Sequence, residues 1–258
     1  MLLAADLHLG RSAEADLDRF LAAALDEPDR LVVLAGDLLD RPGGELLLQA
    51  DLLVQELLLA GVRLVLVVGN HDLGGWLGER AGTKGRKLFG KLLGHVLEQP
   101  EVVAHRGFDS IAVIDDDVFV SLRSSHRGQR RRLRVGGVNR IRGEQIEWAR
   151  DVLVRIDTAG KRLHLVTHRS LWHDSGDQHS AMRRRRRLET ELLAPCGFDS
   201  FISGHQHRFV HDEAARTPKT GFKIRRIGLP ALSCGVRSGH AGFVQWRPPG
   251  EEPVLVPT

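Results

Sequence analysis

Apolar and polar residues alternate in blocks along the first part of the chain, and these blocks predict strands separated by helices. Continuous apolar runs are typical of strands buried on both faces, and apolar residues at helical spacing are typical of the helices that cover them. The pattern predicts strands at 1–5, 30–35 and 62–68 and helices at 14–25 and 45–60. Ser12 is expected to cap the first helix and Gly61 to end the second. Strands joined by helices through short connections favour a parallel sheet with right-handed crossovers.

Shorter elements are predicted in the rest of the chain. Strands are expected at 102–104, 110–114, 118–122, 162–166, 198–202, 223–227 and 242–246, and helices at 86–93, 143–157 and 183–193. The segment 73–142 is the least regular, and whether it forms a lid stays open. Neither an internal repeat nor a change in composition that marks a linker divides the sequence. We therefore expect a single domain over residues 1–258.

Polar side chains collect where five of the predicted strands end. They belong to the segments Asp6-Leu7-His8, Gly36-Asp37-Leu38-Leu39-Asp40, Gly69-Asn70-His71-Asp72, Thr167-His168 and Gly204-His205-Gln206-His207. In open α/β sheets ligands bind beyond the carboxyl ends of the strands, so these side chains are expected to meet. Any one of the segments alone also suits a turn or a packed histidine, but five in succession favour a shared site.

The donor types in these segments favour a pair of divalent metal ions. Carboxylate and amide oxygens mixed with imidazole nitrogens suit Mn²⁺, Fe²⁺ or Zn²⁺ better than Ca²⁺ or Mg²⁺. The candidate ligands are Asp6, His8, Asp37, Asn70, His168, His205 and His207. This set is larger than one such ion needs, whereas two ions that share one carboxylate would use all of it.

Composition narrows the class of protein only slightly. Apolar residues make up 42% and charged residues 27% of the chain, which is an ordinary globular balance. The formal charge of +4 is compatible with an anionic substrate but does not require nucleic acid. The two cysteines form no disulfide framework, no signal peptide is recognisable, and polar residues interrupt the leucine-rich segment 46–60. We therefore expect a cytoplasmic protein with no membrane partner.

The order of the five polar segments resembles that of the calcineurin-like metallophosphoesterases. The motifs Asp-x-His, Gly-Asp-x-x-Asp, Gly-Asn-His-Asp, a single His and Gly-His-x-His are all intact between Asp6 and His207. The resemblance implies an α/β fold, a four-layer α/β/β/α sandwich of two mixed sheets. It also implies how the ligands divide between the two ions: Asp6, His8, Asp37 and His207 for one, and Asp37, Asn70, His168 and His205 for the other. His71 would lie near the leaving-group oxygen, with Asp72 orienting its imidazole.

This family resemblance predicts hydrolysis of a phosphoester by attack of metal-bound hydroxide, most readily with Mn²⁺. The chain length, the helix before His168 and the late segment 229–234 resemble the small bacterial phosphodiesterases of the cyclic-nucleotide type, so a phosphodiester is the preferred substrate. A DNA nuclease of the repair type, a phosphomonoesterase and a catalytically silent metal-binding scaffold remain alternatives. The partner is accordingly a phosphoester, with a nucleotide or nucleic acid as candidates, and the oligomeric state stays open.

Further residues near these motifs are candidates for contact with the substrate. They are Arg11, Arg41, His173 and His179. Asp40 is expected either to cap the following helix or to hydrogen-bond to a ligand. The five consecutive arginines at 183–187 invite a nucleic-acid interpretation, but consecutive residues on a helix point in different directions. A solvated helix start is therefore the preferred interpretation of that run.

Overall fold

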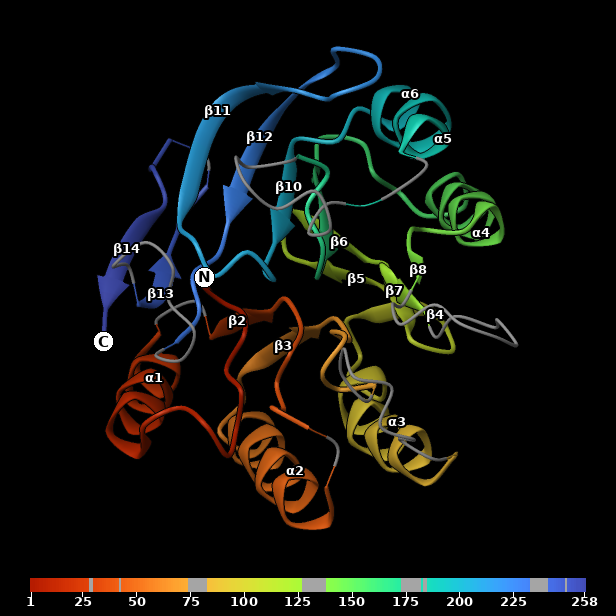
Figure 1. Cartoon of the computed structure of the whole chain (residues 1–258). Helices are drawn as coiled ribbons and strands as arrows, with labels where there is room; N and C mark the ends of the chain where they lie inside the picture. The colour runs from red at the N-terminus through yellow and green to blue at the C-terminus, as the bar shows by residue number, and fades with distance from the viewer. Residues whose placement is uncertain are drawn as a thin grey trace.

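Two β-sheets face each other at the centre of the molecule, and helices cover the outer face of each (Figure 1). The structure is a computed structural model that describes residues 1–27, 30–41, 43–73, 83–126, 138–172, 182, 185–232, 241–248 and 250–258. The two sheets with their helices form the four-layer α/β/β/α sandwich expected from the motifs, so that prediction is confirmed.

The first sheet is built around the three strands predicted at the start of the chain. It runs in the order β14 (Val254–Pro257), β13 (Gly242–Gln245), β1 (Leu2–Ala4), β2 (Leu31–Leu34) and β3 (Arg63–Leu66). The last three are parallel, and β13 pairs antiparallel with β1, so the sheet is mixed. Its outer face is covered by α1 (Glu14–Asp26), α2 (Gly44–Leu59) and α3 (Thr83–Leu97).

The second sheet has a parallel centre and antiparallel edges. Its order is β11 (Val210–Arg216), β12 (Lys223–Gly228), β10 (Ser200–Ser203), β9 (Arg162–Thr167), β6 (Asp117–Ser121), β5 (Asp109–Ile114) and β4 (Val102–Arg106). The outer face is covered by α4 (Gly143–Leu153) and by a second helical segment. That segment joins α5 (Arg186–Leu188), the π-helical turn η1 (Glu189–Leu193) and α6 (Ala194–Cys196). A short antiparallel pair, β7 (Ser125–His126) and β8 (Val138–Asn139), forms a separate two-stranded sheet.

The continuous apolar runs are explained by burial of both faces of each central strand. In β2, Val32 and Leu34 pack outward against the helices, whereas Leu31 and Val33 pack inward against the second sheet. The inner layer also includes Phe119 from the second sheet. Because successive side chains of a strand point to opposite faces, a strand between two apolar layers has no place for a polar residue. Polar residues are therefore displaced to the ends of these strands.

Several local predictions were wrong. Ser12 does not cap α1: its Oγ donates to the Leu7 carbonyl at 2.6 Å, and Ala13 occupies the cap position without a side-chain hydrogen bond. The helix expected over 183–193 begins at Arg186 within the described residues and includes the π-helical turn.

Among the described residues, none of the helices has the length and apolar character needed to cross a membrane.

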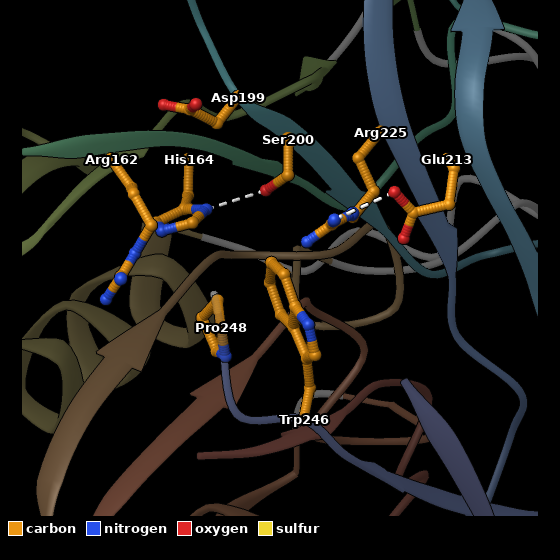
Figure 2. Close-up of a pocket in the computed structure, with 8 residues that line it drawn as sticks. All are labelled: Arg162, His164, Asp199, Ser200, Glu213, Arg225, Trp246 and Pro248. Carbon is orange, nitrogen blue, oxygen red and sulfur yellow. Dashed lines mark hydrogen bonds and ion pairs between the residues drawn. The ribbon is translucent and has the colours of Figure 1, made fainter. Parts of the chain in front are cut away.

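A pocket of about 190 Å³ lies between the sheets at the amino ends of β9, β10 and β12 (Figure 2). Its charged side chains are paired within the protein. Arg162 donates two hydrogen bonds to Asp117 at 2.6 and 2.9 Å, and Arg225 donates to Glu213 at 2.9 Å. His164 bonds through both ring nitrogens, to Asp117 and to the Ser200 hydroxyl, at 2.7 Å each. These contacts pair the charged side chains of the pocket with one another, although Arg225 Nε has no hydrogen bond within the described residues.

Candidate dinuclear metal site

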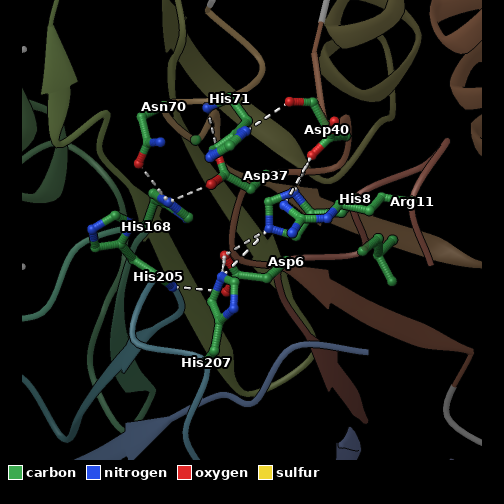
Figure 3. A network of polar contacts seen from close by, with 12 residues as sticks. Asp6, His8, Arg11, Asp37, Asp40, Asn70, His71, His168, His205 and His207 are labelled. Atoms are coloured by element: carbon green, nitrogen blue, oxygen red, sulfur yellow. Dashed lines mark hydrogen bonds and ion pairs between the residues drawn. The ribbon is translucent and has the colours of Figure 1, made fainter. Parts of the chain in front are cut away.

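At the opposite ends of the strands, the predicted polar segments converge on one site (Figure 3). Three groups of side chains each bring ligand atoms within 4.8 Å of one another. The groups are Asp6 with His8 and His207, His8 with Asp37 and His71, and Asp37 with His168 and His205. Because Asp37 belongs to two groups, its carboxylate lies between the candidate ligands of one ion and those of the other. Asp6 and Asp37 follow β1 and β2 of the first sheet, and His168 and His205 follow β9 and β10 of the second. Both sheets therefore contribute residues to the site.

The carboxylates of Asp6 and Asp37 each have one oxygen that accepts a hydrogen bond from a backbone amide and one oxygen that does not. Asp6 Oδ2 accepts a hydrogen bond from the His205 amide at 2.8 Å, and Asp37 Oδ1 accepts one from the His71 amide at 2.7 Å. Among the described residues, the buried Asp6 Oδ1 and Asp37 Oδ2 have no partner with hydrogen-bond geometry. Histidine Nε2 atoms lie close to both of these oxygens, His207 at 3.2 Å from the first and His168 at 3.1 Å from the second.

These leftover oxygens show that the residues fit divalent metal ions. A buried carboxylate oxygen without a hydrogen bond is costly, because it has lost its water and gained no donor. A divalent cation bound between the carboxylates and the imidazoles would satisfy it. The pKa of Asp37 supports an ionised ligand: burial opposes its charge, but the neighbouring imidazoles of His168, His71 and His8 hold its pKa far below the usual value.

Backbone carbonyls orient two of the imidazoles. His168 Nδ1 lies 3.0 Å from the Ala35 carbonyl oxygen, and His71 Nδ1 lies 2.7 Å from that of Asp40. Since a carbonyl only accepts, Nδ1 carries the proton in both residues and Nε2 points to the site. Burial lowers the pKa of His168, but the carboxylates of Asp37 and Asp6 outweigh it and raise that pKa to about 9. A metal ion would therefore have to displace a proton from His168.

The backbone of the site is held in an unusual conformation. Five of the candidate ligands have positive φ angles, between 46° and 69°: Asp6, His8, Asp37, His205 and His207. This left-handed region costs about 1–3 kcal/mol per non-glycine residue and persists where surrounding contacts enforce it, commonly at functional sites. At the end of a strand it turns the chain sharply, which lets neighbouring side chains such as Asp6 and His8 reach the same point.

Glycines in two of the motifs make room for the carboxylates. A Cβ at Gly69 would overlap Asp37 Oδ1, and a Cβ at Gly204 would lie 2.7 Å from Asp6 Oδ2. Contacts this short do not occur in real proteins, so a larger residue at either position would displace a candidate ligand. The motifs Gly-Asn-His-Asp and Gly-His-x-His thus require glycine at their first position for steric reasons.

Asp72, which was expected to orient His71, contacts backbone amides in the structure. Its buried carboxylate accepts hydrogen bonds from the amides of Asp37, Leu39 and Gly69 at 3.1, 2.9 and 2.8 Å. It therefore ties the segment around Asp37 to the turn at Gly69, while the Asp40 carbonyl orients His71. Burial and the nearby charge of Asp37 raise the pKa of Asp72 to about 7.

The remaining predicted residues are placed unequally. Asp40 does not cap α2, because Gly43 occupies the cap position. The Oδ1 of Asp40 lies 3.8 Å from the buried His8 Nδ1 and 3.7 Å from Arg11 Nη1. Arg11 therefore reaches the edge of the site, with a side chain that is 58% exposed. Arg41 follows as an exposed residue. The other two predicted substrate contacts, His173 and His179, lie outside the described residues.

Arg169 is a member of the site that sequence reasoning missed. Arg169 is buried, with 9% of its surface exposed. Its Nη1 lies 2.6 Å from His205 Nε2, and its Nη2 lies 3.1 Å from Asn70 Oδ1. Its Nε lies 3.3 Å from the Ser125 hydroxyl. Burial, together with the positive charges of Arg169 and His168, lowers the pKa of His205 well below its usual value. Its place directly after His168 was the available signal, but arginine is usually a surface residue.

Comparisons with known proteins agree with this architecture. The sequence model of the family described as calcineurin-like phosphoesterase matches residues 1–209. A dimetal phosphatase from Danio rerio is similar in structure at 13% identity and a TM-score of 0.59, over 94% of this chain and 90% of that one. A phosphopantetheinyl hydrolase from Mycobacterium tuberculosis is similar at 16% identity and a TM-score of 0.52, over 89% of each chain.

A third similar structure is a purple acid phosphatase from seeds of yellow lupin, Lupinus luteus, at 17% identity and a TM-score of 0.58. The match covers 94% of this chain and 48% of that one. No functionally curated protein matches the sequence significantly. At these identities the similar structures establish the fold alone, whereas the family match extends over most of the sequence and over every motif of the site. The chain belongs to the calcineurin-like phosphoesterases.

Proposed function

We propose that this protein is a phosphodiesterase that depends on two divalent metal ions, with Mn²⁺ as the preferred ion. The observation that carries the proposal is the shared carboxylate of Asp37, buried between two sets of ligand atoms. Two cations that share a carboxylate lie close enough to act on one phosphoryl group. The mixture of oxygen and imidazole nitrogen donors favours Mn²⁺, Fe²⁺ or Zn²⁺.

The residues divide between the ions as the motifs imply. Asp6, His8, Asp37 and His207 would hold one ion, and Asp37, Asn70, His168 and His205 the other. When bound, the ions supply Lewis-acid stabilisation of the phosphoryl oxygens and lower the pKa of water. The protein contributes the geometry: backbone amides fix the carboxylates, and the Ala35 carbonyl fixes His168 before any ligand arrives.

His71 is proposed to protonate the leaving oxygen. Its Nδ1 is engaged by the Asp40 carbonyl at 2.7 Å, so only Nε2 can exchange a proton with a substrate. Its ring centroid lies 4.8 Å from that of His8, which places it at the rim of the candidate ligands. A proton donor at this position suits a poor leaving group such as an alkoxide.

The preference for a diester rests on the resemblance to small bacterial phosphodiesterases. A phosphomonoesterase is the second candidate, because two of the similar structures are named phosphatases and because the Arg169 guanidinium adds a positive charge beside the site. Since both sheets supply candidate ligands, we also propose that residues 1–258 act as one domain.

A substrate panel tests the proposal. Protein treated with a chelator and then given Mn²⁺ would be assayed on bis-p-nitrophenyl phosphate, p-nitrophenyl phosphate, cyclic AMP and single-stranded DNA. Metal-dependent diester hydrolysis that disappears in Asp37→Asn is the expected result. Preference between cyclic AMP and DNA separates a cyclic-nucleotide enzyme from a nuclease. Faster monoester hydrolysis would overturn the diester assignment, and two bound ions without turnover would indicate a silent scaffold.

A further inference from the structure

Arg169 places a permanent positive charge among the candidate ligands of the second ion. Its guanidinium contacts His205 Nε2 at 2.6 Å and Asn70 Oδ1 at 3.1 Å, and both residues belong to that ligand set. The backbone around it is pinned: its amide donates to the Ser124 hydroxyl at 2.9 Å, and its carbonyl accepts from Thr167 Oγ1 at 2.7 Å. Because the backbone is fixed, a second position of Arg169 would involve the side chain alone.

The hydrogen bond to His205 uses the one lone pair that a metal ion would need. A guanidinium is protonated at all ordinary pH values and only donates, so His205 Nε2 must be the acceptor. An imidazole that accepts a hydrogen bond is neutral and has a single nitrogen lone pair, here on Nε2. With that lone pair on Nε2 and the proton on Nδ1, neither nitrogen remains for a metal. His205 therefore bonds to Arg169 or to an ion, but not to both.

The first ligand set is held together in a different way. His8 Nε2 and His207 Nε2 face each other at 3.4 Å, and His207 Nε2 lies 3.2 Å from Asp6 Oδ1. Ring nitrogens of His8 and His207 and an oxygen of Asp6 thus lie close together, and none of these three side chains carries a permanent positive charge as Arg169 does. The two halves of the site consequently differ in what an arriving cation must displace.

We propose that Arg169 competes with the second metal ion for His205 and Asn70, so that the second ion binds more weakly than the first and enters only when the guanidinium swings away. This inference rests on the proposed function, because it assumes two ion sites. Removal of the guanidinium should tighten the weaker binding step by about 10- to 100-fold, the range that one charge-assisted hydrogen bond represents. The tighter step should change little.

Calorimetric titration of chelator-treated protein with Mn²⁺ tests the inference by binding alone. Wild type is compared with Arg169→Met, which keeps the length of the side chain without the charge. Arg155→Met serves as the matched control, because Arg155 is exposed on the surface and its loss changes the net charge equally. We expect two steps in wild type, a tighter second step in Arg169→Met, and wild-type behaviour in the control.

Two outcomes would overturn the inference while leaving the proposed function intact. One is an unchanged or weakened second step in folded Arg169→Met, and the other is equal affinity of both sites in wild type. Binding of no ion, or of one alone, in every variant would instead overturn the proposed function.

A second measurement on wild type holds even where the variant fails to fold. In crystals equilibrated with increasing Mn²⁺, the anomalous signal of the second ion should rise only as the Arg169 guanidinium leaves His205. An ion at full occupancy with Arg169 still bonded to His205 Nε2 would contradict the proposal.

Discussion

His164 lies in the first half of β9 and His168 directly follows its last residue; both are buried, but they contact different kinds of group. His164 bonds through one ring nitrogen to Ser200 (Figure 2) and through the other to Asp117. Its ring stacks on Phe119 with centroids 4.9 Å apart. His168 also has a partner at each ring nitrogen, but its Nδ1 bonds to the Ala35 carbonyl and its Nε2 lies 3.1 Å from both Asn70 Oδ1 and Asp37 Oδ2, which are themselves candidate metal ligands (Figure 3).

The difference shows that burial of histidine and aspartate does not by itself mark a reactive site. At the amino end of the strands the carboxylates, the imidazole and the hydroxyl bond to one another, and the buried atom there without a hydrogen bond within the described residues is a donor, Arg225 Nε, rather than a ligand atom. At the carboxyl end, the buried Asp6 Oδ1, His8 Nδ1 and Asp37 Oδ2 lack hydrogen bonds within the described residues, and the backbone is strained. Unfilled lone pairs that converge identify the end that binds a ligand.

Asp37→Asn should produce the largest effect on activity, because it removes the charge shared by both candidate ion sites. We expect kcat/KM with Mn²⁺ to fall by about 1,000-fold or more, since metal stabilisation of the transition state amounts to several kcal/mol. The comparison variant is Asp117→Asn at the other end of the strands, which should keep wild-type kcat as long as it is folded. Equal losses of kcat/KM in Asp37→Asn and Asp117→Asn would contradict the assignment of the reaction to the carboxyl ends of the strands.

His71→Ala should cost about 100- to 10,000-fold on a diester with an alcohol leaving group, the usual range for one general acid. The loss should be much smaller on bis-p-nitrophenyl phosphate, because p-nitrophenolate departs without a proton. Both ions should still bind, as measured by calorimetry. Full activity on the alcohol-leaving substrate would remove His71 from the mechanism.

Asp72→Asn should weaken metal binding by about 10- to 100-fold, the usual cost of losing a group that orients a ligand. An amide presents one acceptor oxygen and one donor, so it cannot accept from the amides of Asp37, Leu39 and Gly69 as the carboxylate does. The lower affinity should be overcome by excess Mn²⁺. A loss of kcat at saturating Mn²⁺, matching that of His71→Ala, would instead support the original idea that Asp72 orients His71.

Asp117→Asn should affect stability rather than activity. It breaks the bonds to Arg162 and His164, and we expect about 2–4 kcal/mol of destabilisation at pH 7, less than for a fully buried pair because Arg162 is partly exposed. Burial opposes the charge of Asp117, but His164 and Arg162 lower its pKa in the folded protein.

A lowered pKa means that the stabilisation is present above the unfolded-state pKa of about 4 and disappears as the pH falls through the folded-state value. Urea unfolding of wild type and Asp117→Asn should therefore give free energies that differ at pH 7 and approach each other in acid. A gap that widens in acid would contradict this account.

The sequence predicted the central strands and the candidate ligands well because both depend on local pattern. The run Val62–Val68 is mostly apolar because it packs between two apolar layers. The polar residues that follow it must then lie beyond the end of the strand. The role of Asp72 depended instead on which amides approach it from Asp37 and Leu39, distant in sequence. Arg169 was missed for a similar reason: its burial results from contacts with Asn70 and His205 that only the folded chain creates.

The edge strand β11 was missed from the sequence, although the edge strands β3 and β4 were predicted. β11 pairs with β12 and includes exposed and charged residues, and its register shifts between Asp212 and Ala215. Such a strand lacks both the continuous apolar run and the strict alternation that a pattern search detects. β14, at the edge of the other sheet, was missed in the same way.

The most direct test of the central claim follows bound Mn²⁺ and hydrolysis of bis-p-nitrophenyl phosphate together, as metal is returned to chelator-treated protein. Wild type should bind two ions per chain, turnover should appear with the second ion, and Asp37→Asn should lose both the second ion and the turnover. Undiminished hydrolysis by the chelated protein, or by Asp37→Asn, would contradict a reaction that depends on two ions sharing Asp37.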